Sequence, residues 1–140
     1  MDFGEIGKTA LEQASDFDLV RKLFTEDHVA TEVCATGFQY NGIEDVLGRE
    51  FTRWMTGFPD LNIVVKRVVA ADGVEAVEAI CTGTHEGEFE LGQVLQPTGR
   101  KIDFPFVSLY EIESGRAKTS RHYWDDALIM SQLGVLHLDK

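Results

Sequence analysis

The feature that most constrains this chain is a pair of alternating runs between residues 104 and 136, FPFVSLYEIESGRAKTSRHYWDDALIMSQLGVL. Apolar and polar residues alternate on both sides of a tight turn, which is the pattern of two antiparallel strands. A short segment with helical spacing follows them. A sheet that lines a pocket carries a few polar groups on an otherwise apolar face. We therefore expect the rest of the chain to cover that face.

The turn between these strands decides which polar groups meet. A three-residue loop that ends at Gly115 places Ser108 opposite Ser120 and gathers the polar groups on one face. A two-residue loop shifts the pairing by one and separates His122 from Ser108. We favour the three-residue loop, which also places Phe106 opposite His122. The face then carries Phe106, Ser108, Tyr110, Ser120, His122 and Trp124.

Upstream of this pair, helical periods come first and strand periods later. The expected order begins with a helix or arm over residues 1–14, a capped helix over 16–24 that ends through residues 25–28, a mixed segment over 29–40 and an amphipathic helix over 43–58. Strands over 61–71 and 74–85 joined by Asp72-Gly73, a glycine-rich stretch to residue 99, the two long strands and a final helix over 126–133 follow. This order predicts an α+β architecture in one domain, residues 1–140, with a curved, mostly antiparallel sheet wrapped around the N-terminal helices.

Charge and cysteine content exclude several classes of function. The net charge is −11, from 13 basic and 24 acidic residues, which argues against nucleic acid or an anionic membrane as partner. Cys34 and Cys81 predict free thiols in a reducing compartment. With no signal-peptide pattern, we expect a cytoplasmic location. No GxGxxG, P-loop, CxxC or HxxxH pattern occurs, so we expect neither cofactor nor metal.

His122 is the first candidate for chemistry, because an imidazole with a pKa of roughly 6.5 exchanges a proton at neutral pH. A structural histidine inside a sheet explains it equally well, and the sequence leaves both interpretations open. Asp125 either orients the imidazole or caps the final helix. Ser108 and Tyr110 can donate hydrogen bonds to a carbonyl oxygen or a developing oxyanion.

Further histidines and aromatic residues are candidates for the pocket wall. His28 and His85 fit the surface as well as a pocket, and the aromatic residues fit ordinary core packing as well as a binding site. We assign to ligand binding the residues Tyr110, Phe106, Trp54, Ser120, His85, Trp124 and His28.

Five motifs occur in a characteristic order: Phe58-Pro59-Asp60, Gly83-Thr84-His85-Glu86-Gly87, Pro97-Thr98-Gly99-Arg100-Lys101, Glu113-Ser114-Gly115-Arg116, and His122-Tyr123-Trp124-Asp125 through Ser131-Gln132-Leu133-Gly134. Together, from about Asp16 to Val135, the chain resembles the SnoaL-like polyketide cyclases, also called ester cyclases. The resemblance implies a cone-shaped α+β barrel around an apolar cavity, as in ketosteroid isomerase and scytalone dehydratase. It also implies a homodimer.

The resemblance further implies intramolecular aldol cyclisation without metal or cofactor, with a carboxylic acid and a histidine on neighbouring strands. In this chain the position of the acid falls on His122 and that of the histidine on Ser108. Asp125 matches a frequent aspartate before the final helix, and Ala30 stands where a polar residue is common. Three hypotheses follow: an enzyme that cyclises, isomerises or dehydrates a small hydrophobic carbonyl compound, a non-catalytic module that binds a hydrophobic metabolite, or an oligomerisation domain.

Overall fold

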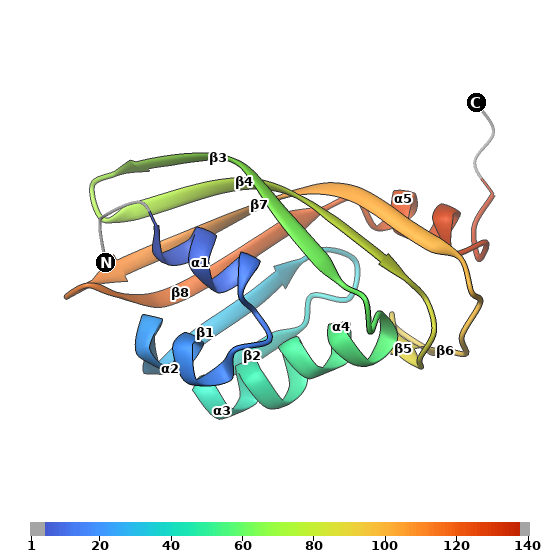
Figure 1. Cartoon of the computed structure of the whole chain (residues 1–140), viewed down its shortest axis with the longest axis horizontal. Coiled ribbons are helices and arrows are strands. Elements are labelled where there is room, and N and C mark those ends of the chain that lie inside the picture. The colour runs from blue at the N-terminus through green and yellow to red at the C-terminus, as the bar shows by residue number, and fades with distance from the viewer. Residues whose placement is uncertain (1–4, 138–140) are drawn as a thin grey trace.

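The computed structural model describes residues 5–137. Its elements are α1 (Ile6–Glu12), α2 (Phe17–Leu23), β1 (Phe24–Val33), β2 (Gln39–Asn41), α3 (Ile43–Asp45), the π-helix η1 (Val46–Phe51), α4 (Thr52–Gly57), β3 (Asn62–Ala71), β4 (Val74–Thr84), β5 (Phe89–Glu90), β6 (Val94–Leu95), β7 (Lys101–Glu113), β8 (Arg116–Trp124) and α5 (Asp126–Gln132). The main sheet has the order β2-β1-β8-β7-β4-β3. It curves around α1, while α2, α3 and α4 lie below it (Figure 1).

The α+β architecture confirms the prediction, and the strand pairs are antiparallel except for β1 and β8, which run parallel. The prediction of a mixed segment over residues 29–40 is wrong, because most of it forms β1 and β2. Two inward positions of β1 carry the polar residues His28 and Glu32, both buried. Since polar side chains occupy positions that normally hold apolar ones, the alternation that marks a half-buried strand is lost from the sequence.

The loop between β7 and β8 has two residues, Ser114-Gly115, both with positive φ (52° and 78°). The prediction of a three-residue loop is therefore wrong. A bulge at Lys118 then shifts the pairing by one residue, so that Ser108 lies opposite His122 and not opposite Ser120. A two-residue loop without a bulge would place Ser108 and His122 on opposite faces of the sheet. The bulge brings both side chains to the concave face.

The amphipathic helix expected over residues 43–58 runs from Ile43 to Gly57, but its central residues 46–51 form the π-helix η1. The hydroxyl of Thr52 donates to the carbonyl of Leu47, five residues earlier, at 2.7 Å. A π segment adds a residue to the turn and changes which side chains face inward, and such segments are frequent at functional sites. Here Val46, Leu47 and Glu50 are all buried.

Helix caps and glycine turns set the ends of the remaining elements. Asp16 caps α2 by accepting a hydrogen bond from the backbone N–H of Leu19 at 3.1 Å. The helix or arm expected over residues 1–14 contains α1, and its residues 1–4 lie outside the described part.

None of the helices formed by residues 5–137 is long and apolar enough to span a membrane.

Candidate functional site

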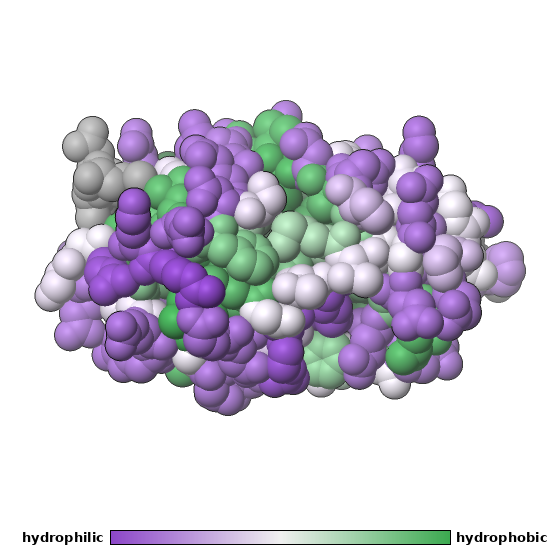
Figure 2. All heavy atoms as spheres, turned by 60° about the horizontal axis from the view of Figure 1, so that its bottom comes forward, coloured by the Kyte–Doolittle hydropathy of each residue, from purple (hydrophilic) through white to green (hydrophobic). Residues whose placement is uncertain are grey.

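The concave face of the sheet encloses an apolar hollow with a free volume of about 80 Å³. Its walls come from α1 and the following turn, β1, the helix of residues 43–57, and β3, β4, β7 and β8. The lining residues are Ala10, Leu11, Ala14, Glu32, Glu50, Phe51, Trp54, Met55, Leu61, Ile63, Cys81, Phe104, Phe106, His122 and Trp124. Figure 2 shows hydrophobic surface across the middle of the face that carries the helices.

The size of the hollow limits what it holds in this conformation. A buried cavity of roughly 150 Å³ accommodates one benzene molecule, which is about twice the free volume here. The free space in this conformation is therefore smaller than one benzene ring requires. The half-buried side chains of Leu11 and Met55 line the hollow. Met55 is unbranched and adapts readily to a ligand.

His122 lies on β8 with its two ring nitrogens in different surroundings. Nδ1 is 2.6 Å from the hydroxyl oxygen of Ser108 on β7, and Nε2 is 3.8 Å from a carboxyl oxygen of Glu50. The side chain is 12% exposed. Burial, with a smaller contribution from the charge of His28, lowers the pKa of His122 from 6.5 to about 4. The imidazole is therefore neutral at neutral pH.

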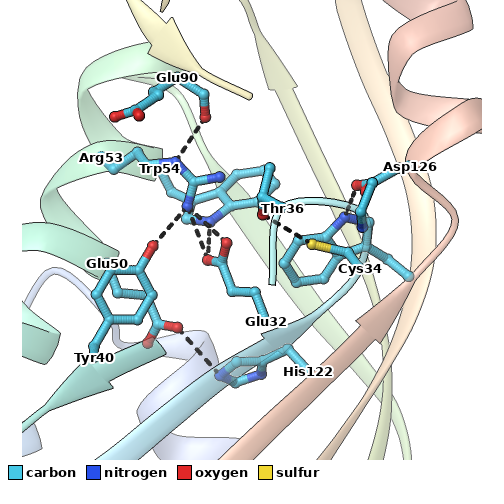
Figure 3. Close-up of polar contacts among 12 residues, drawn as sticks. Glu32, Cys34, Thr36, Tyr40, Glu50, Arg53, Trp54, Glu90, His122 and Asp126 are labelled. Carbon is cyan, nitrogen blue, oxygen red and sulfur yellow. Dashed lines mark hydrogen bonds and ion pairs between the residues drawn. The ribbon is translucent and has the colours of Figure 1, made fainter. Parts of the chain in front are cut away.

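Glu50 projects from η1 toward His122 (Figure 3). Its side chain is almost fully buried, and neither carboxyl oxygen has a hydrogen-bond partner among residues 5–137. Burial, and then the negative charge of Glu32, holds the pKa of Glu50 well above its ordinary value. A raised pKa favours the protonated form of a carboxyl group, which can donate its proton to an oxygen acceptor.

Glu32 differs from Glu50 because it has partners. Nη1 of Arg53 donates to both Glu32 oxygens at 2.8 and 2.9 Å, and Nε1 of Trp54 donates at 3.0 Å. Arg53 also donates to the hydroxyl of Tyr40 at 3.0 Å and to the carbonyl of Glu90 at 2.8 Å. Burial raises the pKa of Glu32, and the charge of Arg53 opposes that rise. Arg53 is thus hydrogen-bonded to Glu32, and its charge lowers the pKa of Glu50 without a hydrogen bond to that carboxyl group.

Among the residues assigned to ligand binding, Trp54, Phe106 and Trp124 line the hollow. Phe106 pairs with Trp124 across the strands, and not with His122 as expected. Ser108 is fully buried and contacts the ring of His122. Tyr110 is also buried, in the apolar cluster that packs around α1 and α2. Neither Ser108 nor Tyr110 is among the lining residues of the hollow.

The remaining predicted residues have other partners. Ser120 and His28 bind each other at 2.8 Å, and the second ring nitrogen of His28 lies 2.8 Å from the carbonyl of Ala117. His85 lies beside Thr98, with 3.0 Å between its Nδ1 and the hydroxyl oxygen. None of Ser120, His28 and His85 lines the hollow in the described part of the chain.

Asp125 does not contact the imidazole in the way that we expected. Its carboxylate accepts hydrogen bonds from the backbone N–H groups of Ala127 and Leu128, at 2.9 and 3.3 Å, and so caps α5. The group that contacts the ring of His122 is Ser108. The expectation that Asp125 orients His122 is corrected: the carboxylate satisfies the helix terminus, which has free N–H groups of its own.

Sequence reasoning missed Glu50, Glu32 and Arg53. For Glu50 a signal exists, because it lies four residues from Trp54 and from Val46 in the apolar stripe of its helix. A carboxylate on the buried face of an amphipathic helix is rare without a functional or structural reason. Glu32 has no comparable local signal, since its inward direction depends on recognising β1 as a strand.

Within residues 5–137, no three side chains of the types His, Cys, Asp and Glu converge in a way that could hold a metal ion. Cys81 lines the hollow, and burial raises the pKa of its thiol to about 12. A thiol in this state is a neutral part of the apolar wall. The hollow therefore combines a neutral imidazole, an unpaired carboxyl group and an ion-paired carboxylate with aromatic walls.

A model of the SnoaL-like polyketide cyclase family matches residues 8–133. The chain belongs to this family. A candidate SnoaL-like polyketide cyclase from Jannaschia sp. CCS1 is 24% identical, with a TM-score of 0.82 over 95% of this chain and 92% of that one. IdmH, a candidate polyketide cyclase from Streptomyces antibioticus, is 25% identical, with a TM-score of 0.72 over 94% of each chain.

The fold likeness extends beyond the cyclases. A protein from Catenulispora acidiphila with a ketosteroid isomerase-like fold, solved in complex with trimethylamine, is 17% identical, with a TM-score of 0.75 over 96% of each chain. These similarities confirm the predicted cone-shaped α+β fold. A comparison with curated proteins found no match.

Proposed function

We propose that this SnoaL-like protein is an enzyme that transfers a proton on a small hydrophobic carbonyl compound, as a step of cyclisation, isomerisation or dehydration. The observation that carries the proposal is the placement of His122. One ring nitrogen is held by Ser108 at 2.6 Å, and the ring lines an apolar hollow as a neutral imidazole. A base held in this way takes a proton from the carbon beside a carbonyl group.

The Ser108 hydroxyl both donates and accepts, so its contact with Nδ1 holds the ring in place in either neutral tautomer, and the proposed base is the tautomer with the proton on Nδ1. When Nδ1–H donates to the Ser108 hydroxyl, Nε2 carries the lone pair and acts as the base. After proton uptake both nitrogens carry protons, and Nδ1–H still donates to Ser108. Ser108 therefore takes the orienting role that we had expected of Asp125. The substrate contacts proposed for the non-reacting part are the aromatic walls Trp54, Phe106 and Trp124.

The family position of the acid is His122 in this chain, so the chemistry differs from that expected of the cyclases. A neutral imidazole in place of a carboxylate makes the site free of formal charge except for the pair of Glu32 and Arg53. This favours an uncharged ligand, because an ionic group would lose its hydration on entering the hollow. The homodimer and the cytoplasmic location stay predictions.

The test is exchange of the α-protons of phenylacetone in deuterated water, followed by proton NMR. We choose phenylacetone because its carbonyl end is small, and we expect its ring to lie at the mouth of the hollow. We expect His122→Asn to lower the protein-catalysed rate about 10²- to 10⁴-fold, the usual range for loss of a general base. His137→Asn, which changes an exposed histidine, is the matched control.

Equal rates for wild type and His122→Asn would refute the role of His122. Binding of phenylacetone by the wild type without any exchange would instead support the second hypothesis, a module that sequesters a hydrophobic metabolite. Binding is measured separately by the fluorescence of Trp54 and Trp124, which both line the hollow.

A further inference from the structure

Glu50 contributes an unpaired carboxyl group to the hollow. The role proposed for His122 does not account for this group. Buried polar groups are normally hydrogen-bonded, and an unpartnered buried carboxyl group lowers stability. Arg53 lies three residues away, but its Nη1 donates to Glu32. Glu50 instead lines the hollow, with both oxygens unpartnered in the described part of the chain. Its missing partner is therefore to be sought in what enters the hollow.

The helix is irregular at this residue. Glu50 belongs to the π-helical residues 46–51, and the i to i−5 contact of Thr52 with Leu47 stabilises the wider turn. Glu50 lies on the buried side of this helix with Val46 and Leu47, and it lines the hollow together with Trp54. π-Helical turns of this kind are frequent at functional sites.

Burial, and then the charges of Glu32 and Asp45, raise the pKa of Glu50, and the charge of Arg53 opposes the rise. The titratable and charged groups that interact with it are Glu32 on β1, Tyr40 on β2, Asp45 on α3, Arg53 on α4, Tyr110 on β7 and His122 on β8. Arg53 is bound to Glu32, and burial raises the pKa values of both tyrosines, so neither tyrosine ionises near neutral pH. His122, at 3.8 Å, faces Glu50 as a neutral base.

Resting on the proposed function, we propose that Glu50 is the catalytic acid of this site and that its carboxyl group donates to the carbonyl oxygen of the substrate. Two features of the geometry support this role of Glu50. Nε2 of His122 and the Glu50 oxygen lie 3.8 Å apart, side by side, so they are close enough to face the α-carbon and the carbonyl oxygen of one ligand. Both groups also border the same apolar space, so one ligand can touch both.

The proton balance of the step is complete without a further reagent. Nε2 of His122 removes a proton from the α-carbon, and the C–H electron pair forms the new C=C bond. The carbonyl π electrons move to oxygen, which takes the proton of Glu50. The products are an enol, a Glu50 carboxylate and a His122 imidazolium. The carboxylate and the imidazolium carry opposite charges and attract each other. An imidazole with a low pKa is a weak base, so simultaneous protonation of the oxygen makes enolisation feasible.

The experiment compares wild type with Glu50→Gln, which keeps the size of the side chain but has no transferable proton. Glu78→Gln, on the exposed face of β4, is the matched control. Two measurements are made: α-proton exchange of phenylacetone, and the infrared C=O band of the protonated carboxyl group with and without phenol, which mimics the enol. We expect at least 100-fold slower exchange in Glu50→Gln. We also expect a carboxylic acid band that shifts when phenol binds and is absent from Glu50→Gln.

The two measurements separate this proposal from the proposed function. Exchange in Glu50→Gln within threefold of wild type would overturn the role of Glu50, even if His122→Asn is inactive. Phenol binding without a shift of the carboxylic acid band, or no phenol binding at all, would overturn it as well. If the wild type exchanges no protons but the band still shifts with phenol, the proposed function fails and the contact of Glu50 with a ligand oxygen stands.

Discussion

His122 and Glu50 make opposite contributions to the pH dependence of stability. When one group is removed by substitution, the contribution of the other becomes measurable. The pKa of His122 is about 4 in the folded protein and 6.5 for an ordinary histidine. The unfolded chain therefore binds this proton more readily, and stability falls as the pH falls from 6.5 toward 4. The pKa of Glu50 is raised, so the folded state binds its proton more readily and stability falls as the pH rises. In the wild type the two contributions therefore have opposite signs.

Glu50→Gln removes the second contribution and leaves that of His122. Because one pKa unit corresponds to about 1.4 kcal/mol, the full difference for His122 amounts to about 3 kcal/mol. About 2.5 kcal/mol of this is lost between about pH 7.5 and about pH 4.5, since protonation of the folded state begins only near the lower limit. The contribution is complete above the ordinary pKa of histidine and is lost on acidification.

The measurement is urea unfolding of Glu50→Gln and of the double variant Glu50→Gln/His122→Asn across this pH range. The difference in unfolding free energy between the two variants isolates His122, because His28, His85 and the acidic residues are common to both. We expect the difference to fall by about 2.5 kcal/mol on acidification. A difference that is constant within about 0.5 kcal/mol would show that the imidazole is hydrated in the folded protein, and it would refute the reasoning.

Two further predictions concern packing and capping. A Cβ at Gly7 would lie 2.5 Å from the ring of Tyr110, whereas Gly48 has no atom within 4 Å of such a position. Gly7→Ala should therefore lower the unfolding free energy by about 1–3 kcal/mol, whereas the control Gly48→Ala should not lower it. Equal Tm values of the two variants in calorimetry would contradict this expectation. Asp125→Ala should cost about 1 kcal/mol through loss of the α5 cap. Asp125→Asn, which keeps an acceptor, should cost less in urea unfolding, and equal losses would exclude the capping role.

The order of elements could be predicted because each has a local signal. The apolar stripe of residues 43–58 predicted a helix and assigned Trp54 to the pocket, where it lies. The strand β1 escaped prediction because His28 and Glu32 occupy inward positions, and their partners come from β8 and α4. No local pattern reveals such partners, since a buried polar residue is recognisable only when its contacts are known.

The β7–β8 register shows a second limit. Either loop length was compatible with the residues around Gly115, and the observed pairing depends on a bulge at Lys118. The parallel pairing of β8 with β1 spans this part of the strand. A bulge in one strand is selected by its neighbours on both sides, so the register of a central strand is a property of the whole sheet.

The sequence by itself determined the α+β order, the two hairpins and the membership of His122 in an apolar strand face, because propensity and periodicity act over a few residues. Only the tertiary structure decided that Glu50 from a helix meets His122 from a distant strand at 3.8 Å. It also decided that Arg53 binds Glu32 and leaves Glu50 unpaired. Sheet curvature and helix placement bring these groups together, and the low polarity of the enclosed space then sets their protonation states.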